Sequence, residues 1–139
     1  MHYDYKRAVQ FALENAGAGA DFPHGNDGGS AAFVARCIQN GLEGISPHVT
    51  DSEALYSGLL ALGAAGTELS RLSLGDLVQI KAAATAPFKS LIVTGKGDDG
   101  EILVTSLAYS AVNRAVKSYL SHETRCLHIP ISQGMNRLN

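Results

Sequence analysis

The strongest constraint on the fold is a change of hydrophobic period near Gly66. Before this glycine, apolar residues recur at helical spacing in three segments, 3–16, 30–40 and 51–62. After it, short β-rich runs follow one another at 77–81, 90–94, 101–107 and 125–131. Helices first and strands afterwards predict an α+β domain, with N-terminal helices packed on an antiparallel sheet of about four to six strands.

The limits of these elements follow from local signals. Asp4 is placed to cap the first helix, and Thr50 has capping-box spacing with Glu53 before the third. The run 97–100 (GDDG) predicts a hairpin turn. We further expect a short helix at 111–120. Because Pro130 cannot donate to a ladder, we also expect the last strand at a sheet edge or with an unpaired end.

Composition narrows the classes of function. A chain of 139 residues, 45% hydrophobic and 17% charged, fits one domain over 1–139. Net charge is −2 with scattered basic residues, which disfavours nucleic-acid binding. No apolar run approaches the roughly 20 residues of a membrane helix. No signal peptide is visible, so we expect a cytoplasmic protein unless a leader precedes this sequence.

The spacing of histidines and cysteines does not indicate a metal site or a redox site. The five histidines show no ligand spacing, and Cys37 and Cys126 form no metal motif. Both cysteines fall at apolar positions, so buried free thiols are favoured over a disulfide. We expect no cofactor.

Three segments, taken in order, carry a resemblance. They are YKRAVQFA at 5–12, SAAFVARCI at 30–38 followed by Gly41, and LSLGDLVQI at 72–80 followed by SLIVTG at 90–95. Together they resemble the amidase-domain family of the papain-like superfamily of bacterial cell-wall peptidases. This implies a papain-like fold over most of the chain.

The resemblance also implies a site. Family members place a catalytic cysteine at the N-terminus of the central helix, where the helix end favours a thiolate, and a strand histidine as its base. Here the cysteine position holds Ser30, the preceding aspartate position Gly29, and the histidine position Lys89. The third polar group should lie near Tyr109, where no histidine stands. Natural degeneration explains several departures at one site better than one engineered change.

Two interpretations of Ser30 remain open. As an N-cap it would accept from the N–H of Ala32 or Phe33 in an inactive domain kept for a peptide or protein partner, or for a structural role. As a nucleophile it would need Lys89 or His24 as base. A pocket at this helix end would be lined by four residues: His24, Asp27, Gly29 and Phe33. The oligomeric state does not follow from the sequence.

Overall fold

The structure is a computed structural model that describes residues 2–17, 29–42 and 49–130. Its helices are α1 (Tyr5–Asn15), α2 (Ser30–Gln39) and α3 (Ser52–Ala61). Its strands are β1 (Ala65–Thr67), β2 (Leu77–Lys81), β3 (Phe88–Lys96), β4 (Ile102–Ser106), β5 (Ala111–Ala115) and β6 (Glu123–His128). Three short 3₁₀ turns are η2 (Leu69–Arg71), η3 (Ala108–Ser110) and η4 (Val116–Ser118).

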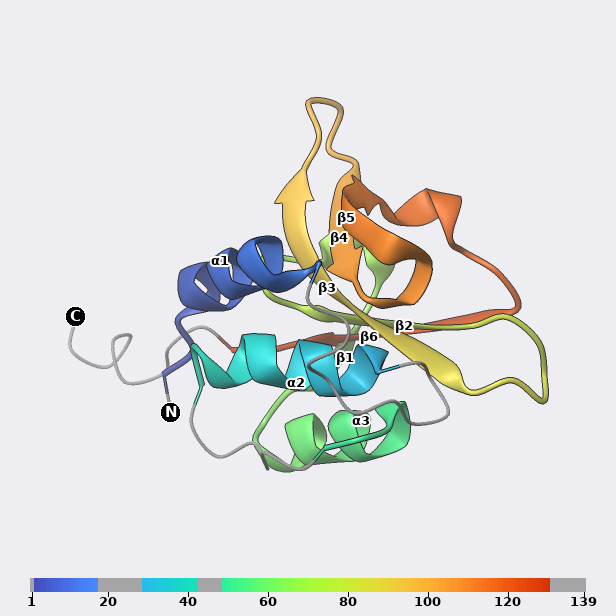
Figure 1. Ribbon diagram of the computed structural model, residues 1–139, viewed down its shortest axis with the longest axis horizontal. Coiled ribbons are helices and arrows are strands. Elements are labelled where there is room, and N and C mark those ends of the chain that lie inside the picture. Colours follow the sequence, from blue (N-terminus) through green and yellow to red (C-terminus); the bar gives the residue numbers. More distant parts are fainter. Residues whose placement is uncertain (1, 18–28, 43–48, 131–139) are drawn as a thin grey trace.

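The described strands form one antiparallel sheet in the order β1-β6-β2-β3-β4-β5. The three helices lie on one side of it, with α2 between α1 and α3 (Figure 1). The predicted α+β class and the strand number of about four to six are therefore confirmed. None of the helices in the described ranges is long and apolar enough to cross a membrane.

Side-chain alternation divides the buried residues into two clusters. Leu77 of β2 and Ile92 of β3 are paired in register and pack with the three helices. Their neighbours Val78 and Leu91, also paired, belong to a second cluster on the opposite face. The phase of β3 therefore decides which of its side chains can meet α2.

The end of α2 passes very close to the start of α1. The Asp4 N–H donates to Gly41 O at 2.8 Å, and the Asp4 carboxylate caps α1 at Arg7 N, as predicted. A Cβ added at Gly41 would lie 2.2 Å from Asp4 O. Only glycine permits this approach of two backbones.

Local boundaries differ from the expectations at two places. The N-cap of α3 is Asp51, whose side chain accepts from Ala54 N at 2.7 Å, and not Thr50. The segment expected as a helix over 111–120 is strand β5 followed by the turn η4. Ala111, Arg114 and Ala115 pair with β4, so tertiary pairing decides the conformation of this segment.

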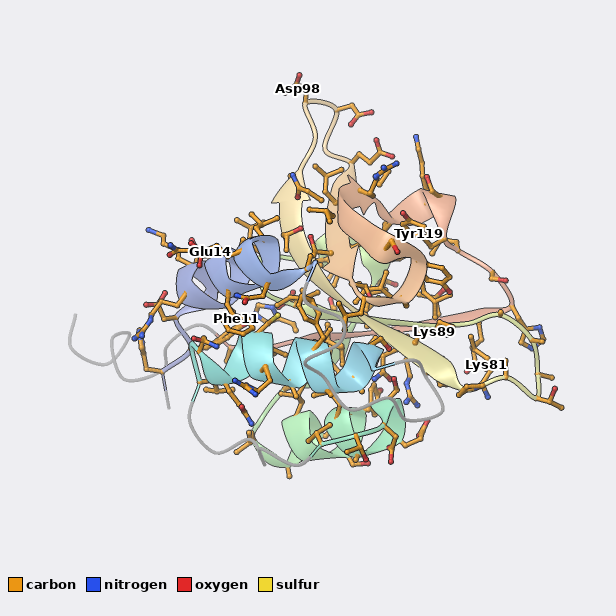
Figure 2. All side chains as sticks on the ribbon, in the orientation of Figure 1. Phe11, Glu14, Lys81, Lys89, Asp98 and Tyr119 are labelled. Carbon is orange, nitrogen blue, oxygen red and sulfur yellow. The ribbon has the colours of Figure 1, made fainter. Side chains whose placement is uncertain are left out.

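The last strand is not at an edge. It ends at His128, so Pro130 lies outside the ladder, and β6 is inserted between β1 and β2. Of the two predicted alternatives, the unpaired end is the one observed, because a proline beyond the last paired residue does not restrict pairing within the strand. The predicted turn at 97–100 is confirmed, with Gly100 N donating to Gly97 O at 2.9 Å and Asp98 at the hairpin tip (Figure 2).

Candidate functional site

Ser30 is the first residue of α2 and does not cap it. The N-cap is Gly29, whose left-handed backbone (φ 90°) turns the chain into the helix. The Ser30 side chain is 0% exposed, and its Oγ accepts from the backbone N–H of Ser90 at 2.9 Å. The expected capping bond to Ala32 or Phe33 is replaced by this link from α2 to β3.

The strand residue that meets Ser30 is Ser90, which is also fully buried. Ser90 Oγ lies 2.7 Å from Ser52 Oγ, at the start of α3. Gln79 of β2 donates from Nε2 to Ser90 Oγ at 3.0 Å and to Ser52 O at 2.8 Å. Ser106 of β4 donates to Ser90 O at 2.7 Å. These buried polar groups tie α2 and α3 to the sheet.

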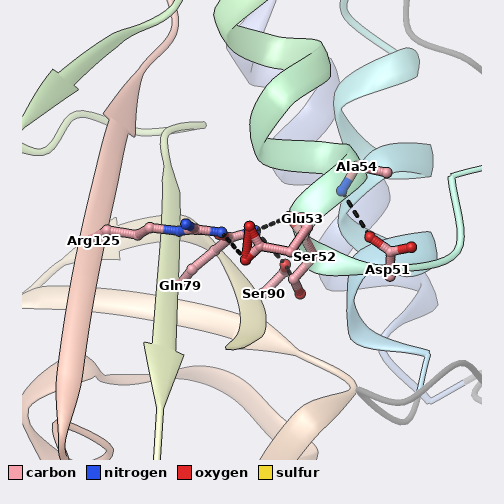
Figure 3. A network of polar contacts seen from close by, with 7 residues as sticks. All are labelled: Asp51, Ser52, Glu53, Ala54, Gln79, Ser90 and Arg125. Carbon is pink, nitrogen blue, oxygen red and sulfur yellow. Dashed lines mark hydrogen bonds and ion pairs between the residues drawn. The ribbon is translucent and has the colours of Figure 1, made fainter. Parts of the chain in front are cut away.

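Arg125 of β6 closes the network at its outer end (Figure 3). Its Nε donates to Gln79 Oε1 at 2.7 Å, and its terminal nitrogen contacts Glu53 Oε2 at 2.8 Å. The guanidinium carbon lies 3.9 Å from the centroid of the Tyr56 ring and 4.0 Å from that of Phe88. Cation–π contacts to both rings and two charge-assisted bonds fix this side chain.

The Lys89 side chain lies on the opposite face of the sheet from Ser30. It pairs with Ile80 of β2, which packs in the cluster on the face away from the helices. Because side chains alternate along a strand, Lys89 points to that face while Ser90 points to α2. The predicted role of Lys89 as the base for Ser30 therefore does not fit the geometry, since a base must reach hydrogen-bond distance.

The other predicted site residues are also dispersed. Tyr109 lies in η3 with φ 64°, is 41% exposed and stacks on Tyr119. Burial and the neighbouring Tyr119 raise the pKa of its phenol, so it stays protonated near neutral pH. Phe33 is fully buried in the core. His24 and Asp27 lie outside the described residues.

A pocket of about 440 Å³ adjoins the network at α3, and Ser30 is not among its described lining residues. Ser52 and Glu53, which belong to the network, line this pocket directly. Its lining is Asp51, Ser52, Glu53, Lys81, Thr85, Ala86, Pro87 and Phe88.

A second buried polar centre is the Asp76 carboxylate, before β2. It accepts from Ser73 N at 2.8 Å and from Ile129 N at 3.1 Å, and His128 Nδ1 lies 3.0 Å from each of its oxygens. Burial raises the pKa of Asp76, although these three contacts act to lower it. The carboxylate joins the start of β2 to the end of β6.

The chemistry open to Ser30 follows from its contacts. The groups linked to it through described contacts are a backbone N–H, serine hydroxyls and the Gln79 amide. None of these accepts a proton from a serine hydroxyl near neutral pH. In the described part of the chain, no three His, Cys, Asp or Glu side chains converge as a metal site either. The hydrogen bonds around Ser30 hold the helices α2 and α3 on the sheet.

Neither cysteine is activated, and both are buried free thiols, as predicted. Burial raises the pKa of Cys37, and burial followed by the Asp76 charge raises that of Cys126 to about 11. We expect iodoacetamide at pH 8 to modify both at least about 100-fold more slowly in the folded protein than in denaturant, where thiol pKa values are about 8.5. Mass spectrometry of quenched samples measures this, and rapid native labelling of either residue would contradict it.

The network of buried Ser52, Gln79 and Ser90 with partly exposed Arg125 was not predicted. Gln79 in the middle of an apolar alternating strand was the one available signal, because a buried amide requires polar partners. Comparison of the chain with protein-family models, curated proteins and solved structures gives no match.

Proposed function

We propose that this chain is a non-catalytic domain of the amidase-like, papain-like type, retained to bind a peptide or a protein partner. One observation carries the proposal: the hydroxyl of Ser30, at the nucleophile position, is fully buried and accepts a hydrogen bond from the Ser90 backbone. An attacking oxygen needs access to substrate and a base in contact, and Ser30 has neither among the described residues.

The surrounding network supports the same conclusion. Ser90 gives its backbone N–H to Ser30 of α2, and its hydroxyl contacts Ser52 of α3 and the Gln79 amide, none of which is a base. A scaffold whose interior polar groups satisfy one another is rigid, which suits a binding surface. The pocket beside α3 leaves room for a ligand next to this framework.

The proposal is tested by assaying the unmodified protein and the Ser30→Ala variant on peptidoglycan and on a chromogenic peptide amide. We expect no turnover above buffer for either protein. A fluorophosphonate probe should also leave Ser30 unlabelled in a folded sample. Hydrolysis that disappears in Ser30→Ala, or labelling at Ser30, would overturn the non-catalytic assignment.

A further inference from the structure

Strand β5 forms one edge of the sheet. Among the described strands it pairs with β4 alone, so its other side has no strand partner there. Edge strands carry backbone donors and acceptors that can pair with an added strand, and proteins use such edges to bind extended peptides.

Exposed apolar side chains are frequent in the segment that contains this edge strand. The described residues include five large hydrophobic side chains that are well exposed, and three of them, Tyr109, Val112 and Leu120, belong to the segment 107–120. The Tyr109 and Tyr119 rings stack with centroids 4.7 Å apart, and Tyr119 lies on the segment that follows β5 (Figure 2). Exposed apolar clusters of this kind mark interaction sites.

The backbone of the same segment is held in a rare conformation. Tyr109 (φ 64°), Ser110 (φ 50°) and Asn113 (φ 53°) are the non-glycine residues with positive φ in the described ranges. Each costs about 1–3 kcal/mol and persists only where its surroundings impose it. Here the Asn113 N–H donates to Thr105 Oγ1, and its Oδ1 accepts from Thr94 Oγ1. These contacts fix the local bend of β5 at Asn113, where the register against β4 also shifts.

The charge of this edge points to one class of partner. The segment 107–120 contains Arg114 and Lys117 and no acidic residue. Lys117 pairs with Glu101 at 3.1 Å, whereas exposed Arg114 has no ion pair with any described residue. Arg114 and Val112 flank Asn113, whose side chain turns inward to Thr94. A partner strand that offers a carboxylate beside an apolar side chain would complement them.

We propose that β5 is a docking edge for an extended acidic peptide, which adds to the sheet as a seventh strand. The peptide places a carboxylate against Arg114 and an apolar side chain against Val112. This inference rests on the part of the proposed function that assigns the domain to binding a peptide or protein partner, and it specifies that partner as an acidic peptide.

The test uses two synthetic eight-residue peptides. In the first, every second residue is threonine and the positions between are isoleucine and glutamate in turn. In the second, lysine replaces each glutamate. Backbone amide shifts of the labelled protein measure binding and its location. We expect saturable shifts at 109–119 with the glutamate peptide and affinity lower by about fivefold or more with the lysine peptide. Arg114→Glu should reverse this preference, and Val112→Lys should weaken binding of the glutamate peptide by a similar factor.

Arg71→Glu is the matched control, because Arg71 is an exposed arginine in η2, which follows the opposite edge strand. It should bind the glutamate peptide as the unmodified protein does. Absence of binding, equal binding of both peptides, or shifts that survive Arg114→Glu unchanged would overturn the proposal. So would self-association in sedimentation that Val112→Lys abolishes, since a second copy would then cover β5. None of these results depends on hydrolysis. The hydrolysis and labelling assays therefore test the non-catalytic assignment independently of peptide binding at β5.

Discussion

Asp76→Ala is expected to lower the free energy of unfolding by about 3 kcal/mol, because it leaves buried donors without an acceptor. The Ser73 and Ile129 N–H groups both point at this carboxylate, and so does the His128 ring. Urea denaturation followed by circular dichroism measures the loss. Asp51→Ala is the matched control: this partly exposed aspartate also accepts from a backbone N–H, and its loss should cost about 1 kcal/mol. Equal effects of the two substitutions would contradict the proposed role of Asp76.

The same carboxyl gives a pH dependence of defined sign. Its pKa is raised by burial in the folded state, above the unfolded value of about 3.9. The folded state therefore binds the proton more tightly, and this contribution to stability is complete below the unfolded pKa and lost as pH rises through the folded pKa. The stability difference between the unmodified protein and Asp76→Ala should be largest at acidic pH. Carbon-13 titration of the Asp76 carboxyl checks the direction directly.

Gly41→Ala should destabilise the domain by about 3 kcal/mol through overpacking. The new Cβ would lie 2.2 Å from Asp4 O, and the hydrogen bond from Asp4 N to Gly41 O prevents an easy separation of the two backbones. Thermal or urea unfolding measures the change.

Gly58→Ala provides the comparison for Gly41→Ala. Gly58 lies in α3 with open space around it, so alanine there should stabilise the helix by about 1 kcal/mol. If both substitutions had the same sign, steric closure at Gly41 would not be the cause.

The sequence is sufficient to predict the fold class but not the site. Helical spacing and β alternation are local properties, and they located α1, α2, α3, β2 and the hairpin between β3 and β4. The phase of β3 is different, because SLIVT is apolar on both faces and its pattern does not say whether Lys89 or Ser90 meets α2. That choice depends on pairing with β2, which brings Ser90 to Ser30.

Arg125 shows a second limit of prediction from sequence. Its partners Glu53, Tyr56, Gln79 and Phe88 come from three separate elements and share no spacing with it. Nor did the residues of 111–120 reveal a strand, because β5 acquires its conformation by pairing with β4. Such contacts exist only after the sheet has assembled.

The position of β6 has a consequence for synthesis of the chain on the ribosome. The last described strand to emerge is an interior strand, and β1, made more than fifty residues earlier, has no described partner in the sheet except β6. Until β6 is released, β1 has no ladder and the donor from Ile129 to Asp76 does not exist. The nascent chain therefore completes its sheet only after translation has passed Ile129, and the unfinished domain exposes the β2 edge to chaperones and to neighbouring chains until then.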